Sequence, residues 1–348
     1  MEKIKIGNKI IGEGEPVYII AEVGSNFDGD KERAKRLVDL AKHCGADAVK
    51  FQSFLADKII CKEAFKEKMS FQSNWDRPVY DVYQNAVFPR EWHKEIAGYC
   101  RDMDIDFLSS PYDNEAVDLL DEIGVPAFKI GSGDITFPQM LEYVAKKGAP
   151  IILGTGASTM AEIEKAVNVI RKAGNDQLIL LQCITNYPSP FEQANIRAMV
   201  ALKEKFHVPV GYSDHTLGSV VPLGAVALGG CVIEKHFTDD KKRRGPDHPF
   251  AMDADDFRAM VRDIRLLEKS LGSYEKSLMP AEKETVILQR RSVYAKQNIP
   301  KGAVISAEMI EILRPARGIL PEQVSLVINR KASIDLKKGD VLTFDKIH

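Results

Sequence analysis

Two histidines occupy equivalent places in two apolar segments of the sequence. The segments VPVGYSDHTLG and VIEKHFTDD each begin with residues typical of a β-strand and then reach an imidazole, His215 in the first and His236 in the second. Imidazoles at the ends of two adjacent strands can converge on one divalent metal ion, with water and substrate completing its coordination. Glu234 and Asp247 lie nearby in the sequence, and they favour this interpretation over a structural role for either histidine.

Two lysines lie in segments of similar type, Lys50 in DAVKFQ and Lys129 in AFKIGSG. A lysine that faces the interior of a sheet structure is costly to desolvate unless an anion meets it. The nearby segments GSGD and GTG offer hydroxyls and glycine-flanked N–H groups, which suit phosphate or carboxylate oxygens. These residues together predict a polyanionic ligand.

Eight short strand-like segments must position these residues. They alternate with helical segments from Pro16 to about residue 270, and they read VYIIAEVG, DAVKFQ, DFLSSPY, AFKIGSG, PIILGTG, LILLQC, PVGYSDHT and CVIEKHF. In AKRLVDLAKHCGA, Ala34, Leu37, Val38 and Ala41 follow the spacing of one buried helix face. The alternation predicts an α/β fold, a closed parallel (β/α)8 TIM barrel. An open doubly wound sheet is the rival, but the glycines lack GxGxxG spacing after the first strand.

The active site of such a barrel lies at the carboxyl ends of its strands. Polar residues follow the apolar part of these strands, so a single shared site is expected. The candidates at these strand ends are Glu22, Lys50, Gln52, Ser110, Lys129, Ser132, Asp134, Thr185, Asn186, Tyr187, Ser213, His215 and His236. Structural hydrogen bonding is an equally good interpretation of Asn186 and Asp134.

The sequence changes in character after residue 270. We expect the barrel domain to span residues 1–270, a linker to span 271–287, and a small β-rich domain to span 288–348. In this last domain the turns at Lys301-Gly302 and Lys338-Gly339 predict a pair of hairpins.

Composition limits the classes of function. The chain has 348 residues, a hydrophobic content of 45% and a net charge of −2, so neither a nucleic-acid partner nor a membrane partner is expected. No segment has the length of a membrane helix, and MEKIKIGNKI lacks the apolar run of a signal peptide, which predicts a cytoplasmic protein. The charged run EKIKIGNK is short enough to be a solvated face. The five cysteines have no zinc-type spacing and are expected to be reduced thiols.

Several motifs together resemble those of the sialic acid (nonulosonic acid) synthases. They are AEVGSN, ADAVKFQ, FLSSPYD, FKIGSGD, YPSPFE, GYSDHTLG and IEKHFTDD followed by GPDH, and they span most of the chain in order. The tail SVYAKQNIPKG with LRPARG is similar to the antifreeze-like (β-clip) domain of those enzymes. The resemblance implies the condensation of phosphoenolpyruvate with an N-acyl-hexosamine, of the N-acetylmannosamine type, to a nine-carbon 2-keto acid and phosphate.

The resemblance also implies a role for each candidate residue. Glu22 and Asp247 would exchange protons and bind sugar hydroxyls. The metal would be Mn²⁺, with Mg²⁺ or Co²⁺ as alternatives, and would be held by His215 and His236. The phosphate and carboxylate of phosphoenolpyruvate would be bound by Lys50, Ser110, Lys129, Ser132, Thr185 and Ser213, and the sugar pocket would be shaped by Gln52, Asp134, Tyr187 and Phe250.

The resemblance further implies a domain-swapped homodimer. Arg314, in LRPARG, would reach from the antifreeze-like domain of one chain into the barrel of its partner, although Arg317 competes for this role. Nothing in spacing or composition predicts this swap.

Departures from the family pattern leave the acceptor sugar open. The chain has Asn26-Phe27 where many relatives have Asn-His, and Asp134 where many have Glu. The acceptor could therefore be N-acetylmannosamine, a diacetamido-trideoxyhexose that leads to legionaminic or pseudaminic acid, or a 6-phosphosugar. Two other classes of function also stay open: a non-catalytic sugar-phosphate binding module, and an aldolase that uses Lys129 to form a Schiff base.

Overall fold

A computed structural model describes residues 2–65, 72, 75 and 77–348, and the chain divides into two compact units. The first unit runs from Met1 to Gly272 and the second from Ser273 to His348. Each unit has a hydrophobic core of its own.

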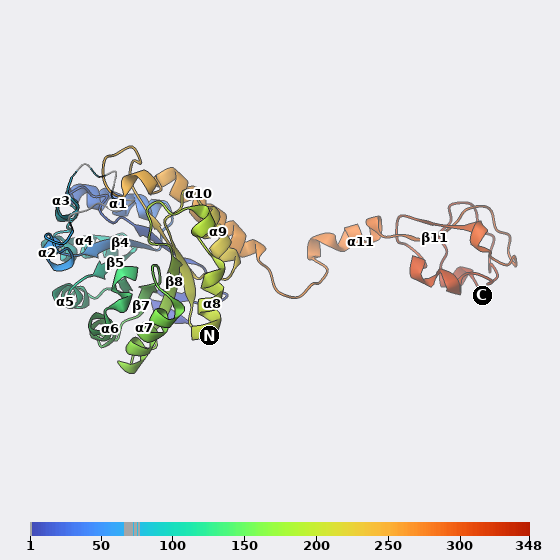
Figure 1. The fold of residues 1–348 in the computed structure, drawn as a ribbon. Coiled ribbons are helices and arrows are strands. Elements are labelled where there is room, and N and C mark those ends of the chain that lie inside the picture. Colours follow the sequence, from blue (N-terminus) through green and yellow to red (C-terminus); the bar gives the residue numbers. More distant parts are fainter. Residues whose placement is uncertain (1, 66–71, 73–74, 76) are drawn as a thin grey trace. The chain divides into compact units, whose positions relative to one another are not determined.

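The first unit contains eight parallel strands, which are drawn in Figure 1. They are β3 (Tyr18–Glu22), β4 (Ala48–Ser53), β5 (Asp106–Pro111), β6 (Phe128–Ile130), β7 (Ile151–Gly154), β8 (Leu178–Cys183), β9 (Val210–Asp214) and β10 (Val232–His236). Their order in the sheet is β5-β4-β3-β10-β9-β8-β7-β6, and β5 packs beside β6. The sheet therefore closes into the predicted TIM barrel.

Helices surround this barrel. They are α1 (Lys31–His43), α2 (Ala56–Ile59), α3 (Val79–Asn85), α4 (His93–Asp102), α5 (Asn114–Glu122), α6 (Pro138–Ala145), α7 (Met160–Lys172), α8 (Arg197–Phe206), α9 (Val220–Ala227) and α10 (Ala254–Ser270). Two of them, α2 and α3, contribute residues to the cavity at the carboxyl ends of the strands. The buried face of α1 consists of the four predicted residues, and the Asp30 carboxylate caps its first turn by accepting from two backbone N–H groups. The alternation of helix and strand read from the sequence is thus confirmed.

An antiparallel hairpin precedes the barrel and was not predicted. Its strands are β1 (Ile4–Ile6) and β2 (Lys9–Ile11), which pair from Ile4 with Ile11 to Ile6 with Lys9. Ile4, Ile6 and Ile11 are buried in a cluster with inward residues of the strands, including Tyr18 and Val232 near the amino ends of β3 and β10. The charged residues Lys3, Lys5 and Lys9 are exposed, as expected of a solvated face, while the isoleucines, spaced for the other face of a hairpin, cover the bottom of the barrel.

The second unit is small and rich in extended segments. Helix α11 (Lys283–Gln289) leads into β11 (Ser292–Ala295), which pairs antiparallel with β12 (Ile310–Leu313). The predicted hairpins are wrong. Gly302 and Gly339 do have positive φ, but Ile299 bridges Leu336 and Val304 bridges Lys331, so the segment around Gly302 pairs with a later segment instead of with its own flank.

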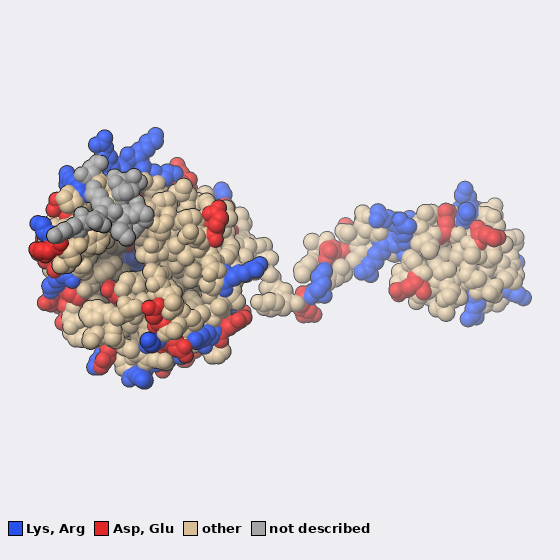
Figure 2. Space-filling view, viewed as in Figure 1, with Lys and Arg blue, Asp and Glu red and all other residues tan. Residues whose placement is uncertain are grey.

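The surface carries both signs of charge. Acidic and basic side chains are interspersed over the face of the barrel unit shown in Figure 2. Among the described residues, helices are too short or too polar to cross a membrane.

Candidate active site

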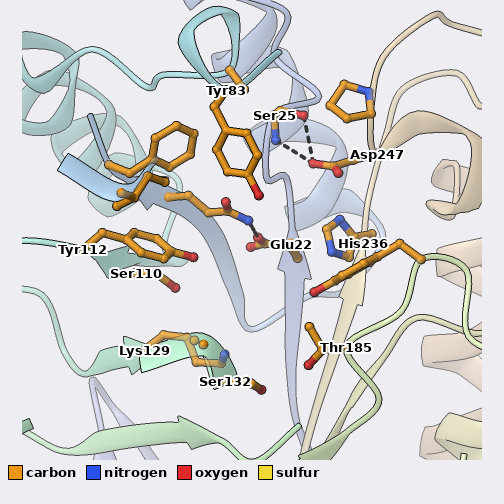
Figure 3. A pocket seen from close by; sticks show the side chains of 18 of the residues that line it. Glu22, Ser25, Tyr83, Ser110, Tyr112, Lys129, Ser132, Thr185, His236 and Asp247 are labelled. Atoms are coloured by element: carbon orange, nitrogen blue, oxygen red, sulfur yellow. Dashed lines mark hydrogen bonds between the residues drawn. The ribbon is translucent and has the colours of Figure 1, made fainter. Parts of the chain in front are cut away.

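A cavity of about 550 Å³ opens at the carboxyl ends of the barrel strands, and Figure 3 shows side chains that line it. Seven of the eight strands contribute to its wall. The predicted residues that line it are Glu22, Lys50, Gln52, Ser110, Lys129, Ser132, Asp134, Thr185, Tyr187, Ser213, His215, His236, Asp247 and Phe250. The structure therefore brings together residues that lie more than two hundred positions apart in the sequence.

Two predicted residues lie outside this cavity wall. Asn186 directs its amide to the carbonyl oxygen of Pro188 at 3.3 Å, which is the structural alternative that the sequence left open. Arg314 is an exposed residue of the second unit.

The two inward lysines are neutralised by carboxylates of the chain itself. Lys50 Nζ lies 2.7 Å from Glu22 Oε2 and 3.5 Å from Glu234 Oε1. Lys129 Nζ lies 3.7 Å from the same oxygen of Glu234. All of these side chains are almost fully buried. The expectation that the lysines need an external anion is therefore incomplete, because Glu22 and Glu234 already supply negative charge.

This cluster stabilises the charged forms of its members. Burial alone would lower the pKa of Lys50, but the carboxylates of Glu22 and Glu234 outweigh burial and raise it. Burial alone would raise the pKa of Glu234, but Lys129 and Lys50 outweigh it and hold that pKa well below its usual range. The cluster is a set of paired charges inside the mouth of the barrel.

Glu234 was expected near the two histidines but was assigned no role in the site, although the sequence contained a signal for one. Side chains alternate between the two faces of a strand, so Glu234 and His236 on β10 must point the same way. Glu234 Oε1 also accepts from Ser213 Oγ at 3.1 Å, whereas Oε2 has no hydrogen-bond partner among the described residues.

The imidazoles of His215 and His236 lie next to each other, with ring centroids 5.5 Å apart. His215 Nδ1 is 2.8 Å from the carbonyl oxygen of Ile184, which can only accept, so the proton resides on Nδ1 and Nε2 keeps its lone pair. Burial, and then the neighbouring His236, lower the pKa of His215 to about 3. His215 is therefore a neutral imidazole with a nitrogen available to a ligand.

The donor set fits a metal ion with open coordination positions. His236 Nδ1 is buried and has no hydrogen-bond partner within the described part of the chain, as expected of a nitrogen that awaits a ligand. No cluster of three or more His, Cys, Asp or Glu suited to a metal is found among the described residues. Two protein ligands would leave the remaining positions to water and substrate.

Carboxylates and a hydroxyl gather on the other side of His236, around Gly24. Asp247 Oδ2 accepts from Ser25 N at 3.0 Å and from Ser25 Oγ at 2.8 Å, as drawn in Figure 3. Glu22 Oε1 accepts from Gln52 Nε2 at 2.7 Å. A Cβ atom at position 24 would lie 2.7 Å from Asp247 Oδ2 and 3.5 Å from both Glu22 Oε1 and His236 Cε1. Glycine thus leaves room for these groups, and Ser25 is a site residue that the sequence did not identify.

Hydroxyls line the opposite wall. Ser132 Oγ accepts from Gly156 N at 2.9 Å, and a Cβ at position 156 would lie 3.1 Å from Ser132 Oγ and 2.3 Å from Thr185 Oγ1. Only a glycine at 156 lets the backbone approach these two hydroxyls so closely. The predicted oxygen-binding groups Ser132 and Thr185 therefore meet in one place.

Aromatic side chains shape the remaining wall. The Tyr187 ring lies 4.2 Å from that of His215 and 5.5 Å from that of Phe250, measured between centroids.

Burial raises the pKa of Asp134 to about 6, and its Oδ2 has no hydrogen-bond partner among the described residues. The sequence missed further wall residues from the connection between β4 and α4 and from the end of β5, which are Phe54, Trp75, Tyr83 and Tyr112.

Comparison with known proteins identifies the class of this barrel. A model described as the NeuB family matches residues 37–276, and one described as the SAF domain matches residues 290–348. The chain belongs to the NeuB family and carries a C-terminal SAF domain, the antifreeze-like domain predicted from the sequence.

Particular relatives have named activities. The chain is 40% identical to N,N'-diacetyllegionaminic acid synthase of Legionella pneumophila, over 98% of this chain and 97% of that one. It is 36% identical to pseudaminic acid synthase of Campylobacter jejuni, over 97% and 98% of the two chains. A crystal structure of N-acetylneuraminic acid (sialic acid) synthetase from Leptospira borgpetersenii, in complex with citrate, superposes with a TM-score of 0.73 and 32% identity, over 82% and 95% of the two chains. These relatives are nonulosonic acid synthases.

Proposed function

We propose that this protein condenses phosphoenolpyruvate with the open-chain form of an N-acyl-hexosamine, giving a nine-carbon 2-keto acid and inorganic phosphate. Family membership supports this class of reaction. The observation that carries the proposal is the convergence of two inward lysines and two imidazoles in a single cavity. The first group is suited to an anion and the second to a metal ion.

The balance of charge supports a need for the metal ion. Among the described residues that line the cavity, three lysines face four carboxyl groups, so the wall has no excess of positive charge. A phosphoenolpyruvate anion would meet an environment that is already neutralised. A divalent cation on His215 and His236, Mn²⁺ first and Mg²⁺ or Co²⁺ as alternatives, would supply positive charge and act as a Lewis acid on the sugar aldehyde.

The lysines and hydroxyls would bind phosphoenolpyruvate. The contacts of Glu234 with Lys50 and Lys129, at 3.5 and 3.7 Å, are longer than a charge-assisted hydrogen bond, so phosphate or carboxylate oxygens can compete for these ammonium groups. The hydroxyls of Ser110, Ser132, Thr185 and Ser213 line the same cavity and complete the set of donors. Such preorganised donors would stabilise the charge that develops during the reaction.

The carboxylates would serve the sugar and the protons. In the proposed reaction, C3 of phosphoenolpyruvate forms a bond to the aldehyde carbon, water adds to C2, and the C2–O bond to phosphate then breaks. The aldehyde oxygen gains a proton. The attacking water loses one proton as it adds to C2 and its second proton as the C2 carbonyl forms, and the departing phosphate can accept that second proton. Glu22 and Asp247, near His236, would handle these protons and the sugar hydroxyls, while Gln52, Asp134, Tyr187 and Phe250 would hold the sugar.

Two classes of acceptor are the leading candidates. The resemblance of the sequence motifs to sialic acid synthases implies the N-acetylmannosamine type, whereas the similarity to legionaminic and pseudaminic acid synthases favours diacetamido-trideoxyhexoses. Part of the cavity wall is apolar, including Ile59, Ile60, Val82 and Phe137, which suits the methyl groups of such sugars.

An acceptor screen tests the proposal. The protein is mixed with Mn²⁺, phosphoenolpyruvate and each N-acyl-hexosamine, and both phosphate release and product mass are measured. We expect phosphate with a product that carries three additional carbons. No release with any acceptor would favour a non-catalytic binding module. Incubation with pyruvate and borohydride should give no covalent adduct, and an adduct on Lys129 would instead support a Schiff-base aldolase.

We also propose that the protein is a homodimer in which Arg314 of one chain completes the site of the other. Light scattering gives the mass of the assembly. Complementation tests the exchange of arginine, because mixed dimers of Arg314→Ala with Lys129→Met chains would contain one intact site. Recovery of activity on mixing two impaired variants is expected, and its absence in verified mixed dimers would contradict the exchange.

A further inference from the structure

His248 is a buried imidazole to which the proposed reaction gives no role. It directly follows Asp247 and is 0% exposed. Both ring nitrogens have partners: Nδ1 lies 2.7 Å from Thr238 Oγ1, and Nε2 lies 3.1 Å from Asp28 Oδ1. A fully buried side chain with two directed hydrogen bonds is fixed in orientation, so its position constrains its neighbours in the chain.

The direction of these hydrogen bonds follows from the partners. An ionised carboxylate can only accept a hydrogen bond, so the proton lies on His248 Nε2 and this N–H group donates a hydrogen bond to Asp28 Oδ1. In the neutral ring, Nδ1 then accepts from the Thr238 hydroxyl, which in turn accepts from Asp240 N at 3.2 Å. Asp28 Oδ2 is also paired with Arg33, at the start of α1. His248 therefore connects the end of β10 with the loop before α1.

The two loops that His248 connects also contact each other beside the cavity. Residues 23–30 carry both Ser25 and Asp28, and residues 237–253 carry both Asp247 and His248. The Ser25–Asp247 hydrogen bonds face the site, as Figure 3 shows. The His248–Asp28 hydrogen bond is a second tie between the same two loops.

The conformation of Asp28 suits this tie. Its φ is +50°, its N–H donates to the carbonyl oxygen of Ser25 at 3.0 Å, and Gly29 follows with φ +70°. Aspartate is among the few residues that adopt this left-handed conformation readily. The loop thus turns sharply and presents the carboxylate to His248.

We propose that His248 is a positioning residue, which holds the Asp247 carboxylate toward the sugar by tying its loop to Asp28. This inference rests on the proposed function, because the role of Asp247 belongs to it. His248 itself does not line the cavity and contacts no reacting atom. Its effect is on the orientation of the Asp247 carboxylate, and small displacements of a catalytic group strongly reduce the rate of a reaction.

A double-mutant cycle tests the tie. His248→Phe keeps the volume of a ring and removes both hydrogen bonds, while Asp28→Gly removes the carboxylate at a position where positive φ costs glycine nothing. Each variant should lower kcat/KM for the acceptor sugar about 10-fold to 100-fold, with KM for phosphoenolpyruvate within about twofold of the parent. The kcat/KM of the double variant should be no lower than that of the more impaired single variant, because both changes break the same His248–Asp28 hydrogen bond. Additive losses would overturn the proposal.

Rescue and exchange measurements separate positioning from folding. His248→Gln can place an amide donor near the position of Nε2, and should recover most of the activity lost in His248→Phe. Hydrogen exchange needs no turnover: in Asp28→Gly and His248→Phe, amides of residues 24–30 and 239–253 should exchange faster. His93→Phe is the matched control, since His93 is equally buried but bonds Ser53 on β4, and it should leave both loops unchanged. Unaltered hydrogen exchange of these loops in Asp28→Gly would overturn the proposal that His248 and Asp28 hold them together. If the parent enzyme turned over none of the acceptor sugars, only the proposed function would be refuted.

Discussion

Strand β10 carries two buried clusters of charge, one on each face. On the outer face, Lys235 Nζ lies 2.6 Å from Asp214 Oδ2 and also donates to the carbonyl oxygen of Thr216. Asp214 also accepts from Thr216 N and Oγ1, so the carboxylate is fully engaged. On the inner face, Glu234 holds two lysines at longer distances, and one of its oxygens has no hydrogen-bond partner among the described residues.

The difference separates a structural ion pair from a functional one. Short contacts with every oxygen occupied leave no place for a ligand, and such a cluster can only stabilise the fold. Long contacts beside a cavity can be exchanged for those of a substrate anion. Burial and charge alone do not distinguish the two clusters, but saturation of their hydrogen bonds does.

Substitution of the two candidate metal-binding histidines tests the functional cluster most strongly. His215→Ala and His236→Ala should each lower kcat about 10³-fold or more, because loss of a Lewis acid removes several kcal/mol of transition-state stabilisation. Calorimetry should show that Mn²⁺ binding is lost in the same variants. Near-normal kinetics in both would remove the metal from the mechanism.

The inner lysine is the next test. Lys129→Met should lower kcat/KM for phosphoenolpyruvate about 10²-fold to 10³-fold, since it removes one preorganised charge. Its thermal melting should stay close to that of the parent, because Lys50 remains to neutralise Glu234. A large loss of stability with kinetics preserved would place this lysine in the structural class.

The outer lysine should behave in the opposite way. Lys235→Met leaves Asp214 buried and unpaired by a charge, which should cost about 3–5 kcal/mol of unfolding free energy in urea titrations. The folded fraction should keep the kinetic constants of the parent. Replacing both partners, Lys235→Met with Asp214→Leu, should recover much of the stability, and failure of that rescue would argue against an isolated pair.

Asp134 gives the smallest expected effect and a dependence on pH. Its pKa is raised from 3.8 to about 6, so the native state favours the protonated form. The stabilisation from this proton is present below about pH 4 and is lost as pH rises through about 6. Asp134→Asn should therefore be more stable than the parent at pH 8, on the order of 1 kcal/mol after allowing for partial exposure. The difference in melting should shrink toward pH 4, and an equal difference at both values would contradict the assignment.

Periodicity in the sequence was sufficient for the barrel and for much of its site. Alternation places Lys50 with Gln52 and Glu234 with His236 on inward faces, and parallel strands bring their carboxyl ends together. Pairings between distant loops, such as Ser25 with Asp247, depend on the closed barrel and leave no local pattern. The same holds for the internal partners of the lysines. An inward lysine indicates a nearby anion, but its sequence neighbours do not reveal whether that anion is a substrate or a glutamate.

The hairpin at the amino ends of the strands has a consequence for the order in which the substrates bind. Its isoleucines cover one end of the cylinder, so in the proposed reaction the cavity at the other end would have to serve both reactants and both products. A reactant that binds deepest, against the lysines, has to arrive before the one above it. Initial-rate patterns should then show an obligatory sequence, with the sugar acceptor entering a complex that already contains its three-carbon partner.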